Sequence, residues 1–260
     1  MELLGISTII GYIISIYSLK YVLTDTDTDR NRIIFDLVYF IILVLFSLYV
    51  YSMIGDFSNK LDFLTSLLIT FLIINFLFFL FMFTRPIQHL GLIILPLSLI
   101  ILIVSMIFSE NQNLGTIPNE LRLHIIVSIT SYGFLGLAAA QAILLNYQEK
   151  KLKRIKNSLF ITILPSIEKM EQVMFELIIL GFIFLTISLL SGAPFIKSEL
   201  DTGLHQKIIF SLIAWITYLY LIYNRFSVGI RGKKANNLAL SGMVFLFIAY
   251  LGTKLFFISF

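Results

Sequence analysis

The sequence predicts an all-α membrane protein, a polytopic helical bundle with about eight transmembrane helices. The chain has 260 residues, of which 58% are hydrophobic and only 13% are charged, and its mean hydropathy is +0.96. A soluble domain of this length could not bury so much apolar surface. Apolar runs of about 20 residues recur, and each is long enough to cross a hydrocarbon core roughly 30 Å thick. We therefore expect one transmembrane domain over residues 1–260, with the lipid bilayer as its solvent.

The first half of the chain is predicted to contain four spans, at 2–22, 33–54, 61–83 and 89–108. Polar breaks separate them: TDTDTDRNR after the first, GDFSNK after the second and Thr-Arg-Pro after the third. The fourth ends at SENQNLGTIPNE, whose Asn, Gly and Pro residues are typical of a loop. The first run lacks a positively charged leader and a small-residue cleavage site, so we expect a retained helix rather than a cleaved signal peptide.

The second half is predicted to contain the spans 121–146, 172–192, 206–224 and 237–258. The breaks between them contain YQEKKLKRIKN, APFIKSELDTGL and RFSVGIRGKKANN. Residues 159–171, LFITILPSIEKME, are too short and too polar to span a bilayer and contain a proline, which is unfavourable inside a helix. We expect an interfacial connector there.

The distribution of Lys and Arg predicts the orientation of the spans, since cytoplasmic loops carry an excess of both. The odd-numbered breaks are rich in them and the even-numbered breaks are poor. The odd breaks contain Arg30, Arg32, Arg85, Lys150, Lys151, Lys153, Arg154, Lys156, Arg225, Arg231, Lys233 and Lys234, against Lys60, Arg122, Lys197 and Lys207 in or beside the even breaks. The odd breaks are therefore expected in the cytoplasm, and both termini on the outer side.

Composition and motifs exclude several functions. The formal net charge of +4 is explained by cytoplasmic loops that face anionic lipid, and the chain lacks a nucleic-acid-binding motif, so we expect no nucleic-acid partner. The absence of cysteine rules out disulfides, thiolate metal sites and thiol–disulfide exchange. The sequence contains no phosphate-binding G-x-x-x-x-G-K-[ST], no H-E-x-x-H and no G-x-S-x-G.

The three histidines fall at span ends. His124 begins the fifth span and His205 the seventh, both on the predicted outer side, whereas His89 begins the fourth span on the opposite side. Two histidines at one membrane face can supply two neutral imidazole nitrogens to one metal or heme iron. The simpler alternative is that each is a solvated residue at the interface.

Polar and aromatic residues follow the two outer histidines. Ser128, Ser131 and Tyr132 lie four, seven and eight residues after His124, which places them on one side of a helix. Polar groups this deep in a span normally face the bundle interior or a cavity, but hydroxyls also join neighbouring helices. Trp215, the single tryptophan, lies ten residues after His205 and can pack either on a macrocycle or on another helix.

The second half of the chain resembles the cytochrome c assembly transmembrane family. Four segments carry the resemblance, in the family's order: LRLHIIVSITSYGFLGLAAAQAILLNYQEKKLK, GFIFLTISLLSGAPF, HQKIIFSLIAWITYLYLIYNR and IRGKKANNLALSGMVFLFIAYLGTK. The similarity covers about residues 60–258 and is strongest from 121 onward. Within the family it is closest to the YpjD-like inner membrane proteins, with HemX as a more distant cousin.

The resemblance implies heme as a cofactor near the outer face of a bacterial inner membrane. In the related cytochrome c synthases, outer histidines flank a tryptophan-rich loop, W-G-x-x-W-x-W-D. His124 matches the first of these histidines, and Trp215 lies in the segment that matches the helix after the loop. The loop itself, GAPFIKSELDTGLHQK, has no tryptophan here, and His205 stands where it ends. The second outer histidine of the synthases is missing from the last span, which ends LGTKLFFISF.

These similarities and departures lead to a functional prediction. We expect heme to be bound or positioned by axial ligation from His124 and His205, with Trp215 and Tyr132 lining the pocket. The missing tryptophans favour an accessory heme-handling protein over a heme lyase and leave enzymatic activity open. Other cytochrome c maturation or membrane proteins are the expected partners. The alternatives are a membrane scaffold or regulator that has lost heme and, less favoured, a small-molecule transporter.

Overall fold

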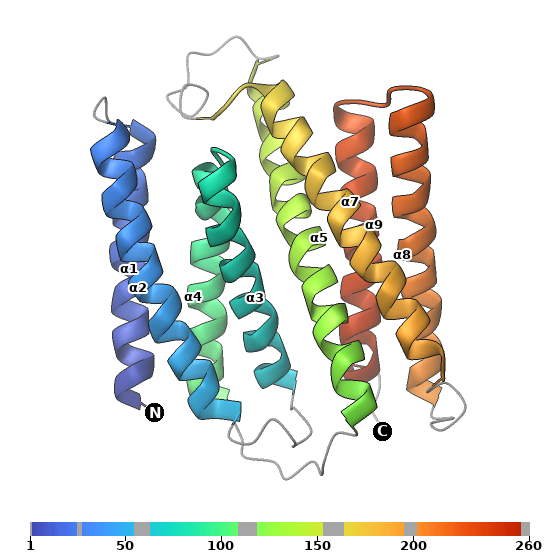
Figure 1. Ribbon diagram of the computed structural model, residues 1–260, viewed down its shortest axis with the longest axis horizontal. Coiled ribbons are helices and arrows are strands. Elements are labelled where there is room, and N and C mark those ends of the chain that lie inside the picture. The colour runs from blue at the N-terminus through green and yellow to red at the C-terminus, as the bar shows by residue number, and fades with distance from the viewer. Residues whose placement is uncertain are drawn as a thin grey trace. The chain divides into compact units, whose positions relative to one another are not determined.

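A computed structural model describes residues 2–24, 28–54, 63–108, 119–152, 164–194 and 202–255. All regular structure in these ranges is helical (Figure 1). Seven of the described helices are long and apolar enough to cross a membrane, which confirms the predicted membrane fold. The elements are α1 (Glu2–Thr24), α2 (Thr28–Ile54), α3 (Phe63–Thr84), the 3₁₀ turn η1 (Gln88–Leu90), α4 (Gly91–Phe108), α5 (Asn119–Leu152), α7 (Ile167–Gly192), α8 (Thr202–Ser227) and α9 (Lys233–Leu255). The eighth predicted span, 237–258, corresponds to α9, and its residues 256–258 lie outside the described ranges.

The start of α7 corrects the predicted connector at 159–171. Helix α7 begins at Ile167, directly after Pro165 and Ser166, so the last five residues assigned to the connector are helical. The proline precedes the helix instead of interrupting it, and Glu168 lies in the first turn, where a negative charge is favourable. Met170, Val173 and Met174 are buried, so this polar-looking segment has one apolar face. Residues 159–163 lie outside the described ranges.

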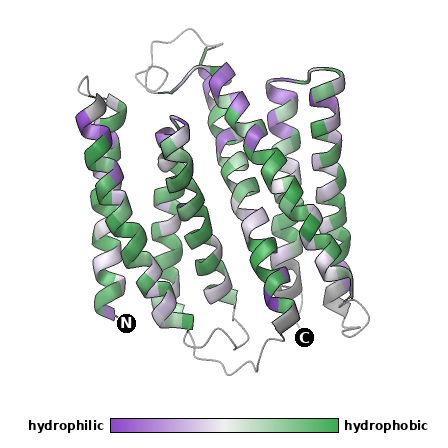
Figure 2. Cartoon of the chain, viewed as in Figure 1, coloured by the Kyte–Doolittle hydropathy of each residue, from purple (hydrophilic) through white to green (hydrophobic). Residues whose placement is uncertain are grey.

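The chain clusters into two compact units, each built around four of the long helices. The first unit contains α1 to α4 and the second contains α5, α7, α8 and α9. In each unit, consecutive long helices run in opposite directions (Figure 1). Figure 2 shows apolar residues along the helices and hydrophilic residues gathered at the end of the second unit where α7 and α9 begin. The single domain over 1–260 remains a prediction.

One asparagine joins the four helices of the first unit. Asn75 on α3 is buried, and its Oδ1 accepts hydrogen bonds from Tyr39 of α2 at 2.6 Å and Tyr12 of α1 at 3.3 Å. Its Nδ2 donates to Ser98 Oγ of α4 at 2.7 Å and to the carbonyl of Phe71 at 2.7 Å. Since an unpaired amide is costly in an apolar interior, this arrangement specifies how the four helices align.

Glycines set the closest helix contacts of the second unit. A Cβ atom at Gly181 of α7 would lie 2.6 Å from Leu135 Cγ of α5, and one at Gly242 of α9 would lie 2.6 Å from the ring of Tyr218 of α8. Ser131 of α5 donates to the carbonyl of Gly181 at 2.9 Å. Small residues at such crossings allow backbones to approach, as is common between membrane helices. This packing brings the first turns of α5 against the end of α7.

Candidate functional site

The imidazole of His124 lies against the last turn of α7. Its Nδ1 is 3.0 Å from the carbonyl oxygen of Ser188 and 3.2 Å from Ser191 Oγ. A carbonyl oxygen can only accept a hydrogen bond, so Nδ1 carries the proton in this contact. In the neutral ring Nε2 then holds the lone pair, and its nearest hydroxyl, Ser128 Oγ, is 3.5 Å away. Metal-binding histidines commonly have this arrangement, with one ring nitrogen donating to a carbonyl and the other facing the metal.

Small residues form the surroundings of this ring. A Cβ atom at Gly192 would lie 2.7 Å from Cε1 of His124, so only glycine leaves the imidazole in place. Ser128 Oγ donates to the carbonyl of His124 at 2.6 Å and is 2.6 Å from Ser188 Oγ. We call these five residues, His124, Ser128, Ser188, Ser191 and Gly192, the His124 cluster. The cluster is half-buried and positions the ring from two helices.

His205 lies near the start of α8, at the same end of the second unit as the start of α5 (Figure 1). Its side chain is exposed, whereas Lys207, two positions later, interacts electrostatically with His124. Side chains two residues apart on a helix point in directions about 160° apart. Lys207 is therefore on a different face of α8 from His205, and it was not among the predicted site residues.

Trp215 and Tyr132 both lie at contacts between helices. The Nε1–H of Trp215 donates to Thr186 Oγ1 of α7 at 2.9 Å, and the indole stacks on Phe182 with the ring centroids 5.5 Å apart. Tyr132 lies beside Ser211 of α8 and makes an edge contact with Tyr250 of α9, with the ring centroids 6.1 Å apart. Trp215 thus faces α7, whereas Tyr132 faces α8 and α9. Tyr132 thus connects α5, the helix of His124, to its neighbours, and Trp215 connects α8, the helix of His205, to α7.

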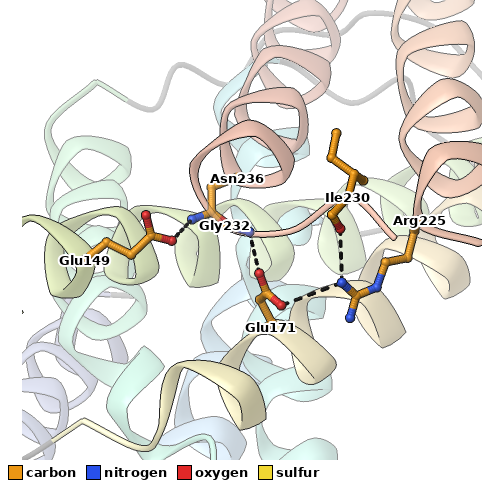
Figure 3. Close-up of polar contacts among 6 residues, drawn as sticks. All are labelled: Glu149, Glu171, Arg225, Ile230, Gly232 and Asn236. Atoms are coloured by element: carbon orange, nitrogen blue, oxygen red, sulfur yellow. Dashed lines mark hydrogen bonds and ion pairs between the residues drawn. The ribbon is translucent and has the colours of Figure 1, made fainter. Parts of the chain in front are cut away.

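A second polar cluster lies at the opposite end of this unit (Figure 3). Glu171 of α7 is buried, and its carboxylate accepts a hydrogen bond from the Gly232 N–H at 2.5 Å and pairs with Arg225 at 3.6 Å. Asn236 of α9 donates to Glu149 of α5 at 3.2 Å. Glu171 lies in the segment predicted as a connector, and Glu149, Arg225, Gly232 and Asn236 lie in predicted polar breaks. The two glycines in RFSVGIRGKKANN could have indicated a tight turn at this place. Gly229 and Gly232 adopt positive φ angles of 73° and 62°, which glycine does at little cost.

Comparison with known proteins identifies the family. The family of the cytochrome C assembly protein matches residues 34–259. The chain belongs to this family. The match confirms the predicted resemblance and begins before the expected residue 60.

Three relatives show how far the similarity extends. Inner membrane protein YpjD of Escherichia coli strain K12 is 29% identical over 133 residues, which are 51% of this chain and 50% of that protein. Cytochrome c biogenesis protein CcsA of Chlamydomonas reinhardtii is 28% identical over 141 residues, 53% of this chain and 38% of that protein. CcsA of Prochlorococcus marinus strain MIT 9303 is 29% identical over 90 residues, 34% of this chain and 28% of that protein. The matched region thus spans half or less of each relative's length.

Proposed function

We propose that this protein binds or positions heme at the end of the second unit where α5 begins. The family is one of cytochrome c assembly, and two of its relatives are named cytochrome c biogenesis proteins. The Lys and Arg distribution predicts that this end faces outward, and similarity to an inner membrane protein supports a bacterial cytoplasmic membrane. The role is accessory, in cytochrome c biogenesis or heme handling, because the sequence lacks the tryptophan-rich loop of the synthases.

The hydrogen bond from His124 Nδ1 to Ser188 is the observation that carries the proposal. It orients the ring and leaves Nε2 with the lone pair that an axial iron ligand needs. His205, exposed at the same end of the unit but on another face of α8 than Lys207, is the proposed second ligand, which requires the first turn of α8 to rotate toward His124. Trp215 and Tyr132, which pack between helices, are proposed to lie beside the heme from α8 and α5. When bound, heme supplies an iron centre and a planar apolar ring, and the protein supplies the ligands, the orientation and a partly dry environment.

A heme titration with matched variants tests the proposal. The purified chain is expected to develop a Soret band on addition of heme, and a His124→Ala/His205→Ala double variant is expected to lose it. His124→Asn is the informative single variant, because its amide can donate to Ser188 from the position of Nδ1 but has no counterpart of Nε2. It is expected to keep the fold and to lose the heme spectrum. Gln206→Ala, next to His205, is the control and should bind heme normally.

A membrane scaffold without heme is the second candidate. The same hydrogen bond joins α5 to the last turn of α7, and this contact stabilises the helix pair with or without a ligand. In that case the absorbance spectrum of heme is the same with and without the wild-type protein. The His124→Ala variant then has a lower melting temperature than the wild type, and His124→Asn has a melting temperature close to that of the wild type. A normal Soret band in the double variant would also contradict axial ligation.

A further inference from the structure

The turn between α8 and α9 is held in one conformation by contacts at both of its ends. The carboxylate of Glu171 accepts the N–H of Gly232, and Arg225 Nη1 donates to the carbonyl of Ile230 at 3.0 Å (Figure 3). The Arg225 guanidinium also lies 4.4 Å from the ring centroid of Phe175 on α7. Buried charged hydrogen bonds of this kind are among the strong ones. Residues 228–232 are therefore ordered by α7 and α8 together.

The turn folds back on the end of α8. The N–H groups of Val228 and Ile230 both donate to the carbonyl of Asn224, at 3.1 and 3.2 Å. The candidate membrane span of α8 ends at Ser227. Because the turn returns toward the last helical residues, it stays level with the end of the span. Lipid headgroups occupy this level in a bilayer.

The turn and its flanking residues expose both cationic and apolar side chains. Arg231, Lys233 and Lys234 are exposed, and Phe226 and Val228 are each 77% exposed. Glu171 and Arg225 form an ion pair with each other, and Glu149, which accepts a hydrogen bond from Asn236 beside the turn, offsets one of the three outward cations. Exposed aromatic and apolar residues beside Lys and Arg are typical of a surface at the boundary between headgroups and acyl chains.

We propose that the α8–α9 turn is a binding site for the phosphate of an anionic phospholipid, with Arg231, Lys233 and Lys234 as its ligands. The Arg231 guanidinium can bind phosphate oxygens in a bidentate manner, and the lysines add point charges. Phe226 and Val228 contact the first part of the acyl chains. Glu171 is a positioning residue, since it fixes the turn without facing the lipid.

Lipid retention by the full-length protein tests this site. The protein is inserted into nanodiscs of equal parts phosphatidylglycerol and phosphatidylcholine, released, and its retained lipids are counted by native mass spectrometry. The wild type is expected to retain phosphatidylglycerol preferentially. In the triple variant Arg231→Gln/Lys233→Gln/Lys234→Gln, the ratio of retained phosphatidylglycerol to phosphatidylcholine is expected to fall about fivefold for each cation removed. The control triple variant Lys150→Gln/Lys151→Gln/Lys169→Gln removes equal charge from α5 and α7 and should retain the lipid.

A Glu171→Ala variant separates an organised site from general charge attraction. The substitution makes the protein more positive, so attraction by net charge alone would increase phosphatidylglycerol retention. The proposed site requires the turn to be held, so retention should fall although all three surface cations remain. Three outcomes would each overturn the proposal. They are equal losses of phosphatidylglycerol in the two triple variants, unchanged retention in Arg231→Gln/Lys233→Gln/Lys234→Gln, and increased retention in Glu171→Ala.

Discussion

Residue 192 controls where the imidazole of His124 can lie. A methyl group there would come within 2.7 Å of Cε1 and 3.2 Å of Nδ1, so a Gly192→Ala substitution must displace the ring from Ser188. Groups that orient a metal ligand typically change affinity by about 10–100-fold when they are removed. We therefore expect Gly192→Ala to weaken heme binding by about this factor in an absorbance titration. Ala193→Ser, at the exposed next position, is the control, and equal affinities in the two variants would contradict the role assigned to Gly192.

Individual site residues could be predicted from the sequence where the residue type itself indicates a chemical role. His124 stood out because it shares the predicted outer face with His205 and matches a family histidine, and its place on the fifth span followed from hydropathy. The sequence did not predict that Lys207 interacts electrostatically with His124, since this depends on the rotation of α8 about its axis. Glu171 was also missed, because its partners Arg225 and Gly232 are more than fifty residues away.

At the scale of elements, the contact between α5 and α7 depends on Gly181. A Cβ atom there would lie 2.6 Å from Leu135 Cγ and 3.2 Å from the Leu135 backbone nitrogen, so a flexible side chain alone cannot relieve the clash. We expect Gly181→Ala to destabilise the protein by about 1–3 kcal/mol, as overpacking typically does. Thermal unfolding in detergent measures the effect.

Two comparisons make this prediction specific. Ile183→Ala, on the same helix at a residue that is 48% exposed, should leave the melting temperature nearly unchanged. Because His124 reaches Ser188 across the same pair of helices, Gly181→Ala should also weaken heme binding. A variant with wild-type stability would show that α5 and α7 tolerate a wider separation at this crossing.

The existence of the helices was predictable, but the start of α7 was not. Uninterrupted apolar runs are decisive for membrane spans because each must match the hydrocarbon thickness. The first turns of α7 contain Glu168, Lys169 and Glu171, so they read as polar when taken alone. They are helical because one face is buried within the unit, where Gln141 of α5 donates to the carbonyl of Met170 at 3.2 Å. A single sequence does not display such a partner.

At the scale of the whole molecule, the open question is which ends of the helices face the cytoplasm. The positive-inside rule predicts outward termini, and the absence of native cysteine makes single-cysteine labelling a direct test. Leu3→Cys and Ala193→Cys place thiols at exposed residues predicted outside, and Lys150→Cys places one predicted inside. In intact cells, a membrane-impermeant maleimide should label the first two variants and should label Lys150→Cys only after the membrane is opened. The reverse pattern would place the His124 cluster in the cytoplasm and the α8–α9 turn outside, and it would contradict the outer-face location proposed for heme.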